Sequence, residues 1–155
     1  MKTTLNLCLI LAGGLLLLGC QSEPAEESAD ELPADTLAAP TISLADIAGT
    51  WDMRSVPLSG VDTTATVYQI DVTPDGITFL LPDRDPVVAA VTTSGDSVIV
   101  DAGPFESLRR AGMMVSTHSV YRLESDRLMG SVVAHYVTSD ADSVLNLSAE
   151  GTRAP

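Results

Sequence analysis

The chain has 155 residues and carries eight basic residues against twenty-one acidic ones, so its formal charge is −13. A chain this acidic is a poor partner for nucleic acid or anionic lipid headgroups, because both need basic neutralising contacts. Both cysteines, Cys8 and Cys20, lie in the first twenty residues. The rest of the chain therefore has no thiol for a disulfide or a metal-thiolate site.

The N-terminus has the layout of an export signal. Lys2 supplies a positive charge, residues 5–18 form an apolar run broken only by Asn6, and small residues follow. A membrane-spanning helix needs about 20 apolar residues, and this run ends short of that length. We therefore expect the segment to be removed from the protein rather than retained as an anchor.

Residues 17–20, Leu-Leu-Gly-Cys, resemble the lipobox of bacterial lipoproteins. The resemblance implies that residues 1–19 are a signal peptide and that the Cys20 thiol carries lipid. Stable attachment takes two or more acyl chains, and lipoproteins of this type carry three. Gln21, rather than Asp, after the cysteine implies the outer membrane where a cell has two. The alternative is a buried free cysteine in a helix.

Residues 20–40 are rich in Glu, Asp, Ala and Pro, with almost nothing large and apolar. Such a stretch cannot bury enough surface to offset its ordering entropy. The composition predicts a disordered acidic linker that holds the following domain away from the membrane. An acidic helix over residues 23–32 is the alternative, and prolines at both ends limit it.

Residues 41–155 have the length of one small domain. Valine dominates their apolar residues, and short alternating runs are separated by turn residues, which is typical of strands. Nearly every connection is a tight reversal, so the chain should form an antiparallel meander. The predicted strands cover residues 50–56, 66–73, 77–81, 87–93, 97–102, 113–123, 128–137 and 143–149.

One hairpin can be tested on the sequence, because a turn at Ser125-Asp126 fixes which residues face each other. One face of this hairpin is then apolar or small on both strands, as a buried side would be. An aromatic side chain also covers a strand glycine there. The predicted pairs on this face are Leu123 with Leu128, Tyr121 with Gly130, Ser119 with Val132, Thr117 with Ala134, and Val115 with Tyr136.

An eight-stranded meander leaves two sheet edges unless it closes on itself. The favoured fold is therefore an all-β, eight-stranded antiparallel up-and-down barrel. A two-layer β-sandwich built from the same strands is the alternative.

A short turn at residues 43–46 followed by Gly49-Thr50-Trp51 resembles the turn and G-x-W motif that close the barrel floor in lipocalins and their relatives. The resemblance implies a lipocalin-like barrel in which an arginine near the end of the last strand packs over the tryptophan ring. Arg153 is the best-placed counterpart of that arginine, so Trp51 and Arg153 are expected to form the barrel closure. Arginine stacking of this kind contributes roughly 0.5 to 2 kcal/mol.

The longest predicted connection, residues 103–112, holds Phe105 and the only adjacent basic pair, Arg109-Arg110. Loops on a rigid scaffold often carry binding function, so this segment is expected either to cover a barrel mouth and grip an acidic group or to be an ordinary linker. Phe105, Arg109, Arg110 and Tyr121 are the candidate ligand-binding residues.

The sequence shows none of the specific catalytic spacings, so we expect no enzyme and no cofactor. In the hairpin register, His118 and His135 are diagonal neighbours on the polar face, with Met114 and Met129 further along it. Such ligands would suit copper, but two imidazoles without a third ligand are more often surface residues, so no metal is expected.

The sequence therefore predicts a membrane-anchored lipoprotein whose barrel binds a small apolar or amphipathic ligand. The alternative is an envelope protein that contacts another protein and takes no ligand.

Overall fold

The computed structural model describes residues 41–60, 62–138 and 143–155. The predicted signal peptide, the lipid site Cys20 and the acidic linker lie outside the described residues, so these remain predictions. In the described part of the chain, no helix has both the length and the apolar character needed to cross a membrane.

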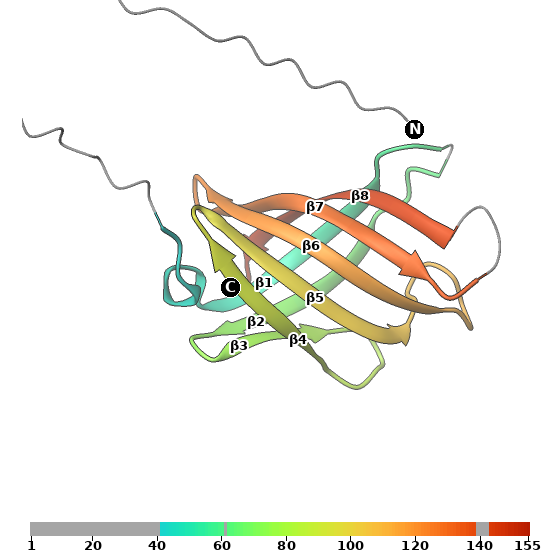
Figure 1. Cartoon of the computed structure of the whole chain (residues 1–155), viewed down its shortest axis with the longest axis horizontal. Helices are drawn as coiled ribbons and strands as arrows, with labels where there is room; N and C mark the ends of the chain where they lie inside the picture. Colours follow the sequence, from blue (N-terminus) through green and yellow to red (C-terminus); the bar gives the residue numbers. More distant parts are fainter. Residues whose placement is uncertain (1–40, 61, 139–142) are drawn as a thin grey trace, which may run out of the picture. The chain divides into compact units, whose positions relative to one another are not determined.

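The described residues form eight antiparallel strands that close into one barrel in sequence order, which confirms the predicted fold (Figure 1). A single 3₁₀ turn, η1 (Leu44–Ile47), precedes the first strand. The strands are β1 (Gly49–Pro57), β2 (Thr66–Thr73), β3 (Gly76–Leu80), β4 (Val87–Ser94), β5 (Ser97–Glu106), β6 (Met114–Glu124), β7 (Arg127–Tyr136) and β8 (Val144–Arg153).

The connections divide between the two ends of the barrel (Figure 1). One end, here called the closed end, carries η1 and the tight hairpins β2–β3, β4–β5 and β6–β7. The other end, here called the mouth, carries the β1–β2, β3–β4, β5–β6 and β7–β8 connections. Because β1 pairs with β8, no strand is left with a long free edge of the kind that promotes aggregation.

The β6–β7 register matches the predicted register at all five positions, from Leu123 opposite Leu128 to Val115 opposite Tyr136. Tyr121 lies opposite Gly130, and a Cβ built on this glycine would come within 2.8 Å of the Tyr121 ring and 2.1 Å of the Val120 carbonyl oxygen. The ring therefore occupies the space that any side chain at residue 130 would need.

Strands β5 and β8 each run four residues beyond their predicted ends, so residues 103–106 are not part of a loop. After a register shift beyond Ala102, β5 resumes pairing with β6, with Phe105 opposite Val115. Gly103 allows this because its φ is +114° and a Cβ there would lie 2.7 Å from the Val115 carbonyl oxygen. The true connection is residues 107–113. Strand β8 likewise runs to Arg153, because its end pairs with Trp51 of β1.

The core lies inside the barrel, and its most completely buried side chains lie towards the closed end. Trp51, Ile70 and Val98 are 0% exposed, and Tyr121 and Leu128 are 1% exposed. All eight strands and the β1–β8 closure lie within residues 41–155, so this segment contains a complete fold with its own core.

Candidate functional site

The closed end is sealed by Trp51 and Arg153, which lie opposite each other on β1 and β8. The indole Nε1 donates a hydrogen bond to the Ile47 carbonyl oxygen at 2.8 Å. The Arg153 guanidinium carbon lies 4.5 Å from the Trp51 ring centroid, and Nη1 donates to the Ala48 carbonyl oxygen at 2.7 Å. The pair thus ties η1 across the barrel floor.

Towards the mouth the interior is not completely filled. A cavity of about 70 Å³ lies there. One water needs roughly 10–15 Å³, and drug-sized pockets hold about 300–1,000 Å³, so this cavity has room for only a few water-sized groups. Its lining comes from every strand except β4 and from the β3–β4 and β5–β6 connections: Ser55, Thr66, Tyr68, Phe79, Leu81, Phe105, Ser107, Leu108, Arg109, Val115, Thr117, Ser119, Val132, Ala134, Tyr136 and Leu147.

The space arises from small side chains on neighbouring strands. Thr117 of β6 lies between Ala102 of β5 and Ala134 of β7, and both alanines are buried. One step deeper, Ser119 lies between Val100 and Val132. On the opposite wall, aromatic rings of β2 and β3 occupy the interior. Tyr68 stacks on Phe79 there, with 5.7 Å between the ring centroids.

Hydroxyl groups are grouped at the inner end of the cavity. The Tyr68 hydroxyl lies 3.2 Å from Ser55 Oγ and 3.4 Å from the Tyr121 hydroxyl. Burial raises the pKa of Tyr68 and raises the pKa of Tyr121 well above its ordinary value. Both phenols are therefore neutral over the physiological pH range and act as hydrogen-bonding groups.

Two more hydroxyls on β6 lack a hydrogen-bond partner. Thr117 Oγ1 and Ser119 Oγ are buried, and neither makes a hydrogen bond within the described part of the chain. Burial dominates the pKa of the Tyr121 phenol and raises it, while the Ser119 side chain acts in the opposite direction, but the Ser119 and Tyr121 hydroxyls do not meet hydrogen-bond geometry. A buried unpaired hydroxyl costs about 1–3 kcal/mol of stability. A bound polar group that forms hydrogen bonds with these two oxygens would therefore stabilise the protein.

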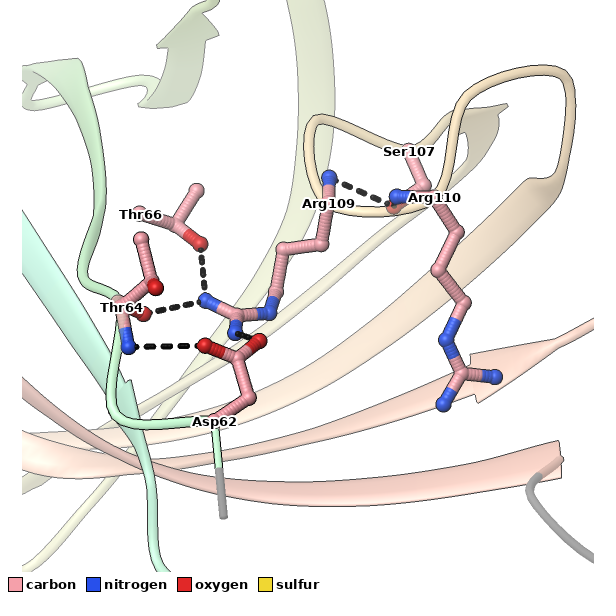
Figure 2. Close-up of polar contacts among 6 residues, drawn as sticks. All are labelled: Asp62, Thr64, Thr66, Ser107, Arg109 and Arg110. Carbon is pink, nitrogen blue, oxygen red and sulfur yellow. Dashed lines mark hydrogen bonds and ion pairs between the residues drawn. The ribbon is translucent and has the colours of Figure 1, made fainter. Parts of the chain in front are cut away.

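The β5–β6 connection, residues 107–113, folds over the mouth and is here called the lid. Ser107 anchors it: the residue is 3% exposed, and its Oγ accepts hydrogen bonds from the backbone N–H groups of Arg109 and Arg110, each at 3.0 Å (Figure 2). These bonds form a tight turn that sends the two arginine side chains in different directions (Figure 2). Leu108, between Ser107 and Arg109 in the sequence, lines the cavity.

Arg109 fastens the lid to the far side of the barrel. Its Nη2 lies 2.6 Å from Asp62 Oδ2, and its Nη1 donates to the Thr64 carbonyl oxygen at 2.7 Å and to Thr66 Oγ1 at 2.8 Å (Figure 2). In the strand order, the β1–β2 and β5–β6 connections lie on opposite sides of the mouth. The Arg109 side chain, only 13% exposed, therefore spans the opening. We call these contacts the latch.

The latch carboxylate is held in its charged form. Hydrogen bonds from Thr64 keep the pKa of Asp62 below its usual range, and the Arg109 charge adds to this effect. One of the Thr64 bonds comes from the backbone N–H, at 2.9 Å. Asp62 is thus ionised and oriented towards the guanidinium at neutral pH.

Two further arginines surround the lid. The Arg110 guanidinium carbon lies 4.1 Å from the centroid of the Tyr136 ring, which lines the cavity. Arg84, in the β3–β4 connection, pairs with the Glu106 carboxylate at 3.6 Å and donates to the Glu106 carbonyl oxygen. Three of the seven arginines therefore lie around the mouth of a very acidic chain.

The structure brings together only part of the predicted ligand-binding set. Phe105 and Arg109 line the cavity, and Arg110 packs behind its wall on Tyr136. Tyr121 is not among the lining residues, because it lies deeper, with its hydroxyl against Tyr68.

The two histidines are on the outer surface of the barrel. His118 Nδ1 lies 2.7 Å from Asp101 Oδ1, and both His118 and His135 are exposed. In the segments that the structure describes, no group of three His, Cys, Asp or Glu residues is placed to hold a metal ion.

Several site residues were missed from the sequence: Asp62, Thr64, Thr66, Ser107, Thr117 and Ser119. The last two could have been identified, because the predicted β6–β7 register already placed them on the inner face. For Asp62 no local signal exists, since its partner is 47 residues away.

Comparisons with protein-family models, curated proteins and solved structures returned no match for this chain.

Proposed function

We propose that this protein is a lipid-anchored envelope protein whose lipocalin-like barrel binds a small apolar or amphipathic molecule. The observation that carries the proposal is the cavity under the latched lid, with apolar walls, hydroxyls at its inner end and a guanidinium across its opening. Concave, mostly apolar sites with a few convergent polar groups are typical of small-molecule binding.

The cavity volume restricts the ligand. About 70 Å³ admits a compact molecule of a few non-hydrogen atoms while the lid is closed. A larger molecule requires the lid to move, and the latch is the contact that such a movement breaks.

Native mass spectrometry of residues 41–155, released gently from cells, tests the proposal. We expect an added mass on the wild-type domain that disappears on mild unfolding. Ala134→Leu fills the cavity from β7 and should abolish the added mass, whereas Ala90→Leu, the same change at an exposed position of β4, should keep it. An added mass that survives Ala134→Leu would place the molecule elsewhere.

The anchor is a separate part of the proposal and has its own test. Lipid on Cys20 should give an acylated N-terminal peptide and place the protein in the membrane fraction. Cys20→Ser should release the protein from that fraction and remove the acylated peptide. A membrane-bound Cys20→Ser variant would show that the attachment does not depend on the lipobox.

A second candidate function is protein contact in the cell envelope. Exposed apolar side chains of four neighbouring strand ends lie at the mouth: Leu58, Met114, Val137 and Val144. Apolar surface that gathers in one place is typical of interaction sites. Val137→Glu should then abolish co-purification with a protein partner and leave the bound small molecule of the first proposal unchanged.

A further inference from the structure

The inner end of the cavity differs chemically from its walls. Between this end and the mouth most of the lining is apolar, with Phe79, Phe105 and Val115 as examples, but the inner end presents hydroxyl oxygens. Ser119 is 0% exposed and Thr117 Oγ1 is fully buried, and both lack a hydrogen-bond partner among the described residues. Native proteins pair nearly all such groups, so each unpaired one calls for an explanation.

The missing partner should be uncharged. No basic side chain lines the inner end, because the only cationic residue of the lining is Arg109, which crosses the mouth to Asp62. A carboxylate at the inner end would be stripped of water without a cation to compensate it, which is costly. The raised pKa values of Tyr68 and Tyr121 show the same preference, since burial there disfavours the charged form of the phenols.

The two ends of the site therefore suit different ligand groups. A hydroxyl or carbonyl oxygen can exchange hydrogen bonds with Thr117 and Ser119, because a hydroxyl side chain both donates and accepts. The rest of the ligand would lie against the apolar walls under Leu108. An alcohol, ketone or similar neutral molecule with a short apolar body has both features.

We infer that the ligand is a small neutral amphiphile that enters with its oxygen first and bonds to the Thr117 and Ser119 hydroxyls at the inner end of the cavity. This inference rests on the proposed function and specifies its ligand class. It assigns the preference for an oxygen-bearing molecule over a hydrocarbon to two residues of one strand, and the exclusion of acids to the lack of a cation at the inner end.

The test uses three probes matched in their number of non-hydrogen atoms: 1-butanol, n-pentane and propanoate. Each is titrated into residues 41–155 while the methyl resonances of Val115, Val132 and Leu147, which line the cavity, are followed by NMR. The same titrations are run on a Thr117→Val/Ser119→Ala double variant. Thr117→Val exchanges the hydroxyl for a methyl group of similar size, and Ser119→Ala removes only the hydroxyl oxygen. The double variant therefore nearly keeps the shape of the cavity wall.

The decisive quantity is the ratio of the pentane and butanol dissociation constants. We expect the double variant to shift this ratio towards pentane by about tenfold, because each hydrogen bond contributes a factor of about 2–10. Propanoate should bind to neither protein. An unchanged ratio, or tighter binding of propanoate than of butanol, would overturn the inference.

The outcomes separate the inference from the proposed function. If pentane binds wild type and the ratio does not change, the cavity is real and only the hydroxyl assignment fails. If neither pentane nor butanol moves the cavity methyl resonances, the proposed function itself fails. The double variant is titrated only if its circular dichroism spectrum matches that of wild type. If it does not fold, the same titrations are run on the Thr117→Val single variant.

Discussion

Arg109 and Asp62 come from connections on opposite sides of the barrel mouth, and their side chains meet with 2.6 Å between Nη2 and Oδ2. The same guanidinium also binds the Thr64 carbonyl oxygen and the Thr66 hydroxyl, so one side chain joins the lid to β2 across the opening. We predict that this contact limits access to the cavity.

Arg109→Ala should loosen the lid without unfolding the barrel. Charge-assisted hydrogen bonds are lost from a side chain that is only 13% exposed, so we expect backbone amides of residues 107–113 to exchange about tenfold faster. The matched control is Arg122→Ala, which removes an arginine–aspartate pair with Asp96 at the closed end. Equal acceleration of lid exchange in both variants would argue against a latch.

Acid should weaken the same contact. Because the pKa of Asp62 is lowered in the folded protein, its contribution to stability is fully present above the ordinary aspartate pKa of about 3.9 and is lost as the pH falls through the folded value. Asp62→Asn should therefore show a flatter dependence of the urea midpoint on pH between about 2.5 and 5 than wild type. A constant difference between the two proteins over this range would mean that Asp62 titrates normally.

Loss of the Arg153 guanidinium should destabilise the closed end. Arg153→Met removes the contact with the Trp51 ring and the bond to the Ala48 carbonyl oxygen, so we expect a loss of about 1–2 kcal/mol in unfolding free energy. Trp51 is the only tryptophan, so its fluorescence reports both the unfolding and the altered environment of the ring. Arg127→Met, which removes an exposed pair with Glu150, should cost less than about 0.5 kcal/mol. Similar losses of unfolding free energy in the two variants would show that the Arg153 contacts stabilise the protein no more than an exposed ion pair does.

Gly130→Ala should be poorly tolerated. The new Cβ would lie 2.1 Å from the Val120 carbonyl oxygen, and a backbone atom cannot rotate away, so the strands must shift. We expect about 2–3 kcal/mol of destabilisation in urea unfolding. At Gly76 an added Cβ meets no atom within 4 Å, so Gly76→Ala should be nearly neutral. If both variants lose equally little stability, strands β6 and β7 can move apart to accept the new Cβ at small cost.

Thr117→Val should keep or raise stability, unlike most core substitutions. It replaces a buried, unpaired hydroxyl with a methyl group of similar size, so the unfolding free energy should rise by up to about 1 kcal/mol. Thr92→Val, at an exposed position of β4, controls for the change in strand propensity. A clear loss of stability in Thr117→Val alone would mean that the hydroxyl already has a bonding partner in solution.

Much of the fold followed from local pattern. Alternating valines and short polar turns predicted all eight strands, and the Ser125-Asp126 turn fixed the β6–β7 register, because both depend on residues close in sequence. The Gly103-Pro104 pair misled the prediction of strand β5, since glycine there serves close backbone approach rather than a turn. The latch escaped prediction because Arg109 and Asp62 meet only once the barrel has closed.

The measurement that bears most directly on the central claim is methyl NMR of residues 41–155 under xenon pressure, since xenon enters small apolar cavities without needing hydrogen bonds. We predict saturable shifts for Val115, Val132 and Leu147, and none when Ala134→Leu fills the space. Unmoved resonances at these three residues in wild type would contradict a cavity open to small molecules beneath the lid.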